Sequence, residues 1–446
     1  MHKTIAVIGS GISGLSAAWL SGQAHDVTLF EKAPVLGGHS NTVVVDTADG
    51  AVPVDTGFIV FNELNYENLT AMFAHLGVET APSDMGFAVS VGNGRMEYSG
   101  QNLKGLFGQK RNIVKPRHWR LVGDILRFFR EAETQARSIP DSMSIGDFLD
   151  AHGYSEAFAE DHLLPISAAI WSTPARSMLE FPAQSFIKFF ANHHLLKVNI
   201  NERPTWRTVQ GGSRHYVSAL AASGRFKAET NARIAQVERH AEGVDLVFSD
   251  GARRRFDEVV FACHADEALA LLHTSDDDER AVLSAFGWTQ NHAVLHTDQS
   301  FMPKRRHLWS AWNYRRTAEC DGTQLSLSYW MNKLQPLPTA TPVFVTLNPG
   351  HDFAPGSVHY ETTYSHPLFD AKSVRAQHEM GRIQGRGGLW YAGAWLGYGF
   401  HEDGLQAGLE VAERLGGVRR PWQVKKARDR IAHTWAGEEE ALWAAE

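Results

Sequence analysis

The chain has 446 residues, of which 43% are hydrophobic, and its 43 Lys and Arg against 50 Asp and Glu leave a net charge of -7. A chain of this length and apolar content can bury the cores of two or three domains, which excludes a disordered protein. The acidic total argues against nucleic acid as a partner. Two cysteines without a Cys-x-x-Cys spacing argue against a disulfide framework or a cysteine zinc site. We expect a cytoplasmic protein, because the sequence shows neither a leader pattern nor an apolar run of about 20 residues.

The first forty residues predict a strand, a glycine turn, a helix and a second strand. Apolar runs at 5–8 and 27–30 are typical of buried parallel strands, and residues 15–20 are typical of a helix. Glycines in the turn allow a tight reversal, close approach of a pyrophosphate and close packing of the helix, whose N-terminus attracts phosphate. An acidic residue at the end of the second strand can accept hydrogen bonds from ribose hydroxyls. The residues expected to contact a dinucleotide are Gly9, Gly11, Ser13, Gly14 and Glu31.

A glycine pair then follows Glu31 within the phrase Glu-Lys-Ala-Pro-Val-Leu-Gly-Gly-His. The phrase resembles the Glu-x5-Gly-Gly continuation of the flavin amine oxidase and phytoene desaturase superfamily, in which the glycine pair brings the backbone against FAD. Many members follow the pair with Arg, whereas this chain has His39, which leaves open how the phosphate charge is offset. The resemblance implies further FAD contacts at Lys32, Gly37, Gly38, His39, Thr56 and Gly57.

A second FAD pattern lies near the other end of the chain. Residues 389–395 are typical of a buried strand leading to a glycine turn, and residues 399–408 lead into a helical sequence. This resembles the closing FAD motif of the superfamily, whose helix aims its positive end at the flavin and so stabilises the reduced, anionic form. Many relatives have Gly-Asp where this chain has Gly-Ala. The implied contacts are Gly393, Ala394, Gly404 and Leu405.

The middle of the chain carries weaker patterns that the superfamily shares. The turn Gly211-Gly212 precedes a helical stretch, and the strand at 232–239 contains Val237, whose main chain meets adenine in the superfamily. Residues 256–263 are typical of a strand that returns to the FAD domain. Each pattern alone is ordinary strand and turn chemistry, and the order of the patterns along the chain supports the resemblance.

These motifs predict an α/β fold with a discontinuous, Rossmann-like FAD-binding domain and a second, mixed sheet-plus-helix substrate domain. The active site is expected where the two domains meet. The predicted division is an FAD-binding domain from 1–82, 206–266 and 388–418, a substrate domain from 83–205 and 267–387, and a basic, helical C-terminal tail at 419–446.

Four residues are candidates for catalysis. The resemblance implies that Phe400, just before the closing helix, faces the flavin at the position where flavin amine oxidases carry one Tyr of an aromatic cage. His401 and Glu402 follow it and are candidate proton acceptors, although either can equally be a structural cap. His292 stands nearest to the position where those oxidases hold a Lys close to the flavin. No metal site is expected, because the 22 His residues show neither a His-Glu-x-x-His nor a three-His spacing.

The phrases at 37–42, 55–62 and 397–404 together resemble one branch of the superfamily, bacterial FAD-dependent proteins found beside methyltransferases of the cyclopropane-fatty-acid-synthase type. The branch implies desaturation of a methylated or unsaturated fatty acyl chain of a phospholipid, and a methyltransferase as a partner. Aromatic residues at 181–190 suit an acyl tunnel or, as the alternative, ordinary core packing. Three other functions stay open: a flavin amine oxidase, a flavin-dependent fatty acid double-bond isomerase, and a catalytically silent flavoprotein that docks to the methyltransferase.

A basic segment suggests contact with the inner face of the membrane. Residues 101–130 contain 8 Lys and Arg and one acid, with Trp119, Val122, Leu126 and Phe129 at helical spacing. The pattern predicts a basic amphipathic helix that rests on an anionic bilayer and admits lipid. The alternative is a solvated basic face whose apolar stripe packs on the domain. A second basic cluster, expected to reinforce the first, contains Arg419, Arg420, Lys425, Lys426, Arg428, Arg430 and Trp422.

Overall fold

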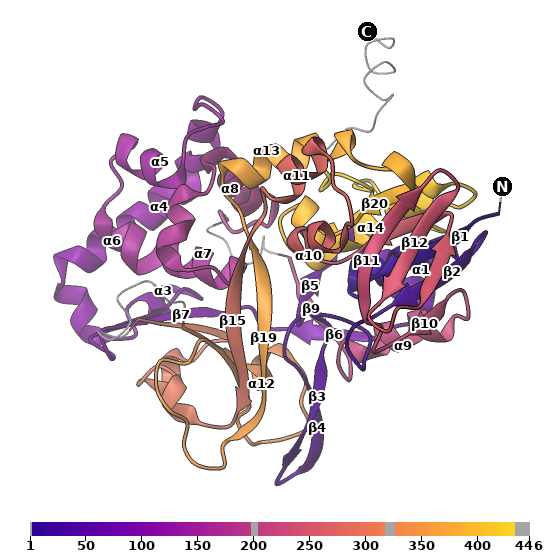
Figure 1. Ribbon diagram of the computed structural model, residues 1–446. Coiled ribbons are helices and arrows are strands. Elements are labelled where there is room, and N and C mark those ends of the chain that lie inside the picture. Colours follow the sequence, from indigo (N-terminus) through magenta and orange to yellow (C-terminus); the bar gives the residue numbers. More distant parts are fainter. Residues whose placement is uncertain (1, 198–203, 317–325, 433–446) are drawn as a thin grey trace.

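The computed structural model describes residues 2–197, 204–316 and 326–432, and has the α/β class that the sequence predicts. A parallel five-stranded sheet, at the right of Figure 1, collects strands from three distant parts of the chain in the order β10-β2-β1-β14-β20. Its strands are β1 (Thr4–Ile8), β2 (Asp26–Phe30), β10 (Lys227–Glu229), β14 (Glu258–Phe261) and β20 (Leu389–Tyr391).

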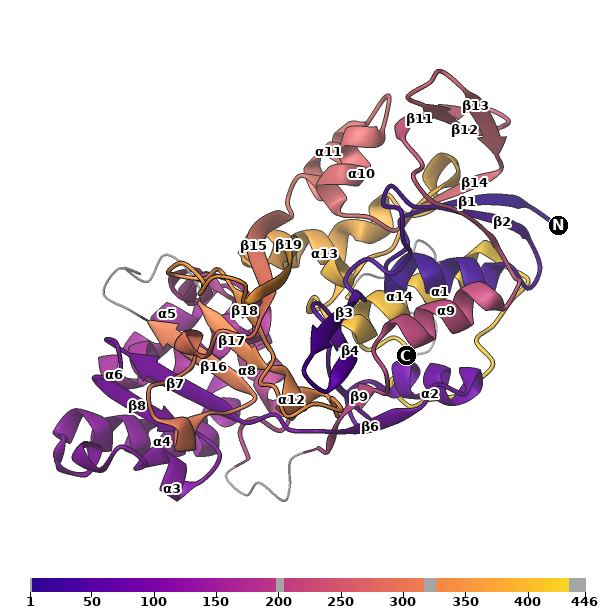
Figure 2. The same cartoon turned by 90° about the horizontal axis from the view of Figure 1, so that it is seen from below.

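Three helices lie beside this sheet, two of them from opposite ends of the chain. Figure 2 shows α1 and α14 side by side, with α9 next to α1. All residues of α1 are buried, which explains its apolar sequence without a polar face. The helices are α1 (Ile12–Ser21), α9 (Arg214–Ala222) and α14 (His401–Leu415).

The second large sheet has seven strands in the order β19-β15-β18-β17-β16-β7-β8, antiparallel except for the pair β16 and β7. The long strands β15 and β19 form a ribbon between the two halves of the molecule (Figure 1). The strands are β7 (Phe87–Val91), β8 (Met96–Ser99), β15 (Gly287–His296), β16 (Trp312–Arg316), β17 (Leu327–Trp330), β18 (Phe344–Leu347) and β19 (Val358–Leu368).

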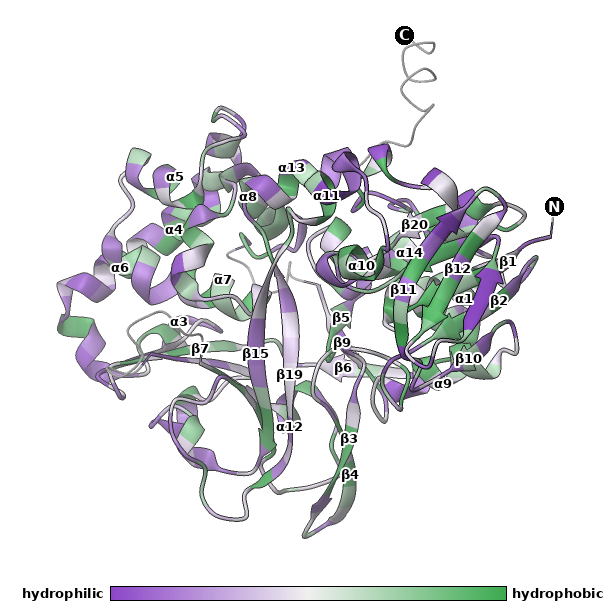
Figure 3. Ribbon diagram, viewed as in Figure 1, coloured by the Kyte–Doolittle hydropathy of each residue, from purple (hydrophilic) through white to green (hydrophobic). Residues whose placement is uncertain are grey.

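A group of helices lies above one end of this sheet, at the left of Figure 1. Figure 3 shows that α4 to α6 carry both hydrophilic and hydrophobic residues, as expected of helices that cover a core. The group consists of α3 (Leu103–Leu106), η1 (Lys110–Val114), α4 (Pro116–Ala136), α5 (Ile145–Ala151), α6 (Glu156–Phe158), η2 (Ala159–Leu163), α7 (Leu164–Trp171), η3 (Ala175–Glu180) and α8 (Ala183–Asn192).

Smaller elements connect these parts. Three small sheets are β3 (Thr42–Thr47) with β4 (Gly50–Asp55), β5 (Phe61–Asn62) with β9 (Trp206–Val209) and β6 (Thr80–Ser83), and β11 (Ile234–His240) with β12 (Gly243–Phe248) and β13 (Arg253–Phe256). The remaining helices are α2 (Glu67–Leu76), α10 (Ala265–Leu271), α11 (Asp277–Leu283), α12 (Met331–Leu334) and α13 (Ala371–Glu379), and the short 3-10 turns are η5 (Gln299–Phe301), η6 (Arg306–Leu308), η7 (Met380–Arg382), η8 (Arg386–Gly388) and η9 (Ala394–Leu396).

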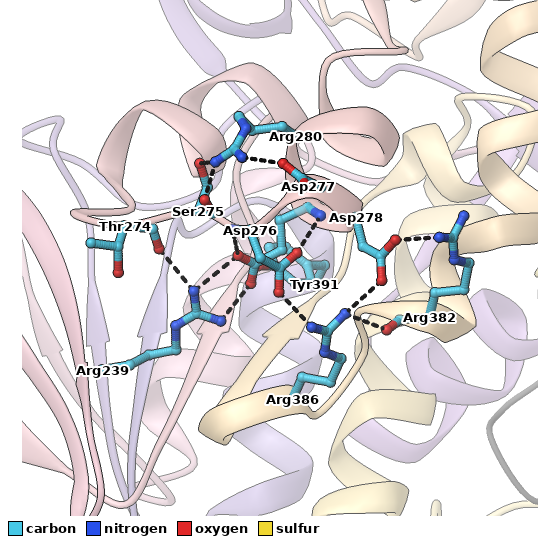
Figure 4. A network of polar contacts seen from close by, with 11 residues as sticks. Arg239, Thr274, Ser275, Asp276, Asp277, Asp278, Arg280, Arg382, Arg386 and Tyr391 are labelled. Atoms are coloured by element: carbon cyan, nitrogen blue, oxygen red, sulfur yellow. Dashed lines mark hydrogen bonds and ion pairs between the residues drawn. The ribbon is translucent and has the colours of Figure 1, made fainter.

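A charged network fastens α11 to the end of the parallel sheet (Figure 4). Glu279 is fully buried and accepts two hydrogen bonds from Arg239 of β11, at 2.8 and 3.0 Å. Arg386, just before β20, pairs with Asp276 and Asp278 at the start of α11. The network therefore links three segments that are far apart in the sequence.

The predicted C-terminal helix is wrong over residues 416–432, which contain no helix. This segment packs on the protein instead, with Trp422 stacked on Trp19 and Arg420 bound to Glu413. Residues 433–446 of the predicted tail lie outside the described part of the chain. The domain boundaries stay a prediction.

Candidate functional site

The glycine turn after β1 lies where the carboxyl ends of β1, β14 and β20 adjoin, the edge at which open parallel sheets bind ligands. Gly9 has a φ of +103°. A Cβ there would come within 2.7 Å of the Ala262 carbonyl oxygen. A Cβ at Gly14 would come within 1.9 Å of the Gly9 carbonyl oxygen, so helix and turn are in direct contact. Only glycine fits at either position.

Two distant segments meet this turn. A Cβ at Gly38, which has a φ of +56°, would lie 3.1 Å from the Cα atom of Gly11. From the other end of the chain, a Cβ at Gly404 would lie 2.8 Å from the Ser13 hydroxyl. The glycine segments that the sequence singled out therefore gather around the N-terminus of α1.

The N-terminus of α1 has room and charge for a phosphate. A Cβ at Gly11 would meet no atom within 4 Å, in contrast to its neighbours in the turn. No side chain caps the helix, and its first turn holds no acidic residue. Uncapped N–H groups and the positive end of the helix dipole favour an anion at such a place. The site thus fits the pyrophosphate of FAD.

Glu31 is held beside the same turn. Its carboxylate accepts hydrogen bonds from the backbone N–H and the hydroxyl of Ser10, at 2.9 and 2.6 Å, and from the Ala33 N–H at 2.8 Å. A carboxylate has about four acceptor positions, so one stays free for a ribose hydroxyl. The contacts fix the orientation of Glu31, and its role toward a ribose stays a prediction.

The two charged candidates beside Gly37-Gly38 supply no free positive charge. Burial and the neighbouring His264 lower the pKa of His39 to about 4, so this imidazole is neutral at pH 7. Lys32 extends outward and pairs with Glu267 at 2.5 Å. The dipole of α1 is therefore the main group that the described residues offer to offset a phosphate charge.

The remaining predicted FAD contacts are placed as follows. Gly57 lies under His39, because a Cβ there would come within 2.2 Å of the His39 carbonyl oxygen, and Thr56 bonds the Tyr364 hydroxyl at 2.7 Å. The carbonyl of Val237 already accepts the His273 N–H at 3.0 Å, which leaves less of its main chain for adenine. Gly393 and Ala394 follow β20, and Leu405 is buried within α14, while Gly37 donates to Ser10. Their roles stay predictions.

His401 begins α14 and lies in a compact polar cluster. Its Nε2 atom is 3.0 Å from both the Ser40 and the Tyr216 hydroxyls, and its ring stacks on Phe58 with centroids 3.6 Å apart. Burial, with a smaller contribution from His39, lowers the pKa of His401 well below 6.5. The ring is therefore neutral and weakly basic, and suits a hydrogen-bonding role better than that of a strong proton acceptor.

Glu402 has a structural position. The carboxylate is buried and accepts the N–H groups of Asn68 and Leu69, each at 3.0 Å, in the first turn of α2. It also accepts from the side chains of Asn68 and Gln406. These contacts use its acceptor positions to cap α2, so the predicted proton acceptor role is not supported at Glu402.

His292 also differs from the prediction. Side chains alternate along β15, and the pairing of the ribbon places Asn291 opposite Tyr364 and His292 opposite Thr363. Tyr364 turns toward His39, with ring centroids 4.8 Å apart. His292 lies on the other face of the ribbon, half-exposed, and pairs with Glu361 at 2.9 Å. We therefore withdraw His292 from the site.

Two residues that the sequence did not single out lie next to His39. Tyr364 and His366 project from β19 toward His39, and Asn291 bonds His366 at 2.9 Å. The alternation Tyr360, Thr362, Tyr364, His366 is the signal that could have indicated a shared face. It could not indicate which element that face meets.

Phe400 precedes α14 and packs in a cluster of aromatic rings. Its ring stacks on Phe189 with centroids 5.2 Å apart, and Trp171 and His193 lie within 6.5 Å. Next to Trp171 is a pocket of about 170 Å³ between η3 and the end of β19. The pocket is lined by Trp171, Thr173, Ser177, Met178, Glu180, Phe181, Leu368, Phe369 and Asp370.

Residues 2–197, 204–316 and 326–432 contain no cluster of three His, Cys, Asp or Glu side chains suited to a metal ion. Within the same ranges, no helix has the length and apolar character needed to cross a bilayer.

Comparisons with known proteins agree with this geometry. The family model of the flavin containing amine oxidoreductases matches residues 12–332. The carotenoid phi-ring synthase of Chlorobaculum tepidum is 33% identical over 105 residues, which are 23% of this chain and only 16% of that protein. A solved CLA-producing fatty acid isomerase from P. acnes has a TM-score of 0.64 at 16% identity, over 92% of this chain and 98% of its own.

A cyclohexylamine oxidase from Brevibacterium oxydans IH-35A also has a TM-score of 0.64 at 16% identity, over 93% of this chain and 99% of its own. Identities this low show a shared fold and leave the substrate open. The family model, however, spans most of the sequence. The protein therefore belongs to the flavin containing amine oxidoreductase family, and is a flavin-dependent oxidoreductase with FAD as its cofactor.

Proposed function

We propose that the protein abstracts a hydride from an apolar substrate and desaturates a methylated or unsaturated fatty acyl chain of a phospholipid. The observation that carries this proposal is the pocket next to Trp171, whose lining includes the aromatic and aliphatic side chains of Trp171, Met178, Phe181, Leu368 and Phe369. Such walls recognise a hydrocarbon by shape and exclude water. FAD, when bound, supplies the hydride acceptor.

Ring contacts connect Phe400 to this pocket through buried aromatic residues of α7 and α8. Trp171 lies 4.6 Å from Phe189 between ring centroids, and 5.0 Å from Phe181. Phe181 in turn lies 5.9 Å from Phe369, at the end of β19. The acidic residues of the adjoining pocket are exposed. An apolar chain that enters this pocket therefore meets aromatic side chains without burying an unpaired charge.

The spacing of the rings supports an acyl chain over an amine. An aromatic cage needs two facing rings with a substrate atom between them, and carbon contacts of about 3.5–4 Å on each side require about 7 Å between the rings. Phe189 and Phe400 are nearly parallel and only 5.2 Å apart, so no substrate atom fits between them. Phe400 therefore offers one apolar face in place of half a cage.

The polar groups nearest the closing helix suit orientation more than proton transfer. The cluster of His401, Ser40 and Tyr216 stays neutral at pH 7, because burial lowers the pKa of the imidazole and raises that of the phenol. A neutral cluster keeps this side of the site free of fixed charge. The resemblance to a branch found beside lipid methyltransferases and the fold shared with a fatty acid isomerase add support by analogy.

Anaerobic addition of phospholipid extracts tests the proposal. We expect bleaching of the flavin and a lipid product lighter by two hydrogen atoms. A product of unchanged mass with a moved double bond would indicate an isomerase. Bleaching by amines, with peroxide released once oxygen is admitted, would indicate an amine oxidase. Retained oxidised FAD with every lipid and amine would indicate a catalytically silent flavoprotein that docks to a methyltransferase.

Two variants sharpen the test. Phe400→Asp places a charge among the aromatic rings beside the pocket, and should slow bleaching by lipid while FAD stays bound. His292→Ala changes a half-exposed residue on the far face of the ribbon, and should bleach at the wild-type rate. Equal slowing of both variants would contradict the proposal that the pocket and its aromatic neighbours bind the acyl chain.

A further inference from the structure

Exposed apolar side chains are concentrated at one place on the surface. Seven large hydrophobic residues are strongly exposed in the described chain, and four of them lie between residues 113 and 126. These four residues, here called the apolar tip, are Ile113, Val114, Trp119 and Leu126. Val114 is 81% exposed and Trp119 is 53% exposed, so solvent covers much of their apolar surface.

The apolar tip is held in a defined arrangement. Ile113 and Val114 belong to η1, while Trp119 and Leu126 are seven residues apart on α4 and so lie on the same side of that helix. The Trp119 indole N–H donates to the Ile113 carbonyl at 2.7 Å, which joins the helix to the turn. Phe107 packs on the indole with ring centroids 4.9 Å apart.

The structure divides the apolar stripe that the sequence predicted. Val122 is buried together with Leu121, Ile125 and Phe128, which anchor α4 in the core. The main apolar face of α4 is therefore unavailable to a bilayer. In this respect the alternative, an apolar stripe that packs on the domain, holds. The tip, made of a 3-10 turn and the flank of α4 beside the buried face, is what stays exposed.

Positive charge surrounds the tip. Residues 101–130 carry 8 basic side chains and one acid. Of these basic side chains, the ones that are exposed and make no ion pair with any described residue are Lys104, Lys110, Arg111, Arg120 and Arg130. The pKa of Lys115 is lowered by partial burial and by the positive charges of Arg111, Arg95 and Arg305. Like charges are thus crowded around Lys115, next to Val114 of the tip.

We propose that the apolar tip and its basic surroundings bind an anionic lipid bilayer. Trp and aliphatic side chains that project from a surface rich in Lys and Arg suit the headgroup region, where apolar groups insert and cations meet anionic lipid. The core of a protein interface is instead depleted in Lys and other charged residues. The many charged side chains around the tip therefore favour a bilayer as the occupant.

The second predicted basic cluster does not join this surface. Arg420, Arg428 and Arg430 pair with Glu413, Glu410 and Asp403, so their charges are balanced within the protein. In both Figure 1 and Figure 2, α3 and α4 lie at the opposite side of the molecule from β1 and β2. The bilayer thus meets the helical group, away from the parallel sheet.

Sedimentation of the FAD-loaded full chain with vesicles tests the proposal without any turnover, so its failure is separate from that of the proposed function. The vesicles are phosphatidylcholine alone or phosphatidylcholine with phosphatidylglycerol. We expect the protein to pellet with the anionic vesicles only, and salt to weaken binding. The pair Lys110→Gln and Arg120→Gln should weaken binding roughly 25-fold, about fivefold per charge.

A pair of matched variants tests whether binding depends on the apolar tip or on any exposed apolar residue. Val114→Glu should abolish binding, whereas Val44→Glu, at a residue of β3 that is 53% exposed, should bind as the wild type does. Absence of wild-type binding at low salt, equal binding to neutral vesicles, or equal loss in the Val44 variant would overturn the proposal. Binding only to membranes that still carry their proteins would overturn it in favour of a protein partner.

Discussion

The substitution Gly11→Ala, which adds one methyl group, should weaken FAD binding without destabilising the fold. Gly11 has φ -62° and ψ 177°, which Ala adopts without strain, and a Cβ there meets no protein atom within 4 Å. Replacing Gly by Ala at such a position stabilises the protein by about 0.4–1 kcal/mol through the unfolded chain. The new methyl group stands where the pyrophosphate must approach the backbone.

The magnitude follows from the contacts that the phosphate would lose. Hydrogen bonds to a charged group contribute about 1.5–3 kcal/mol. Loss of one such bond in Gly11→Ala should therefore weaken FAD binding by roughly 10- to 150-fold. Gly14→Ala is the contrasting variant, because its Cβ would come within 1.9 Å of the Gly9 carbonyl oxygen and must displace the backbone.

Titration of the apoprotein with FAD and thermal unfolding without FAD measure the two effects. Gly11→Ala should unfold at or slightly above the wild-type temperature and bind FAD weakly, and Gly14→Ala should unfold at a lower temperature. A folded Gly11→Ala protein with wild-type FAD affinity would refute the placement of the pyrophosphate at the N-terminus of α1.

Four further predictions concern other groups of the protein. Glu279→Gln should lower the free energy of unfolding by about 2–3 kcal/mol in a denaturant titration, because it leaves the charge of Arg239 unpaired, whereas Asp277→Asn at an exposed pair should change nothing measurable. Glu402→Ala should cost about 2 kcal/mol in the same titration, since α2 loses its cap, without slowing flavin reduction; slower reduction would restore a catalytic role. His292→Ala should reduce its flavin at the wild-type rate in stopped flow. Burial lowers the pKa of His193 from 6.5 to about 3 on folding, so its contribution to stability is present above pH 6.5 and is lost as the pH falls from 6.5 toward 3. Between pH 7 and 5 the free energy of unfolding of the wild type should fall by about 2 kcal/mol more than that of His193→Phe. Equal losses would contradict the burial of a neutral ring.

Local sequence patterns were sufficient to predict the parallel sheet and the turn that follows β1. A glycine turn between two apolar runs restricts the chain to few conformations, and the structure places Gly9, Gly14 and Gly38 in the close contacts that such a turn needs. The pairing of α1 with α14 was predictable from the two FAD motifs, because both motifs require the same nucleotide.

Side-chain roles that depend on distant partners were not predictable. Glu402 caps α2, whose Asn68 lies 334 residues earlier, and no local signal marks that pairing. The face of His292 depends on the register of β15 with β19, which long-range pairing determines. The basic C-terminal tail is predicted from its sequence to be helical and to reinforce a membrane contact, yet Arg430 is buried against Asp403. In each case a tertiary contact overrides the local pattern.

The most direct test of the account is the flavin content of the purified protein. If segments from both ends of the chain together hold one nucleotide, the protein should be yellow, contain FAD in equimolar amount, and rebind FAD after removal. Colourless protein that takes up no added FAD would contradict the central claim.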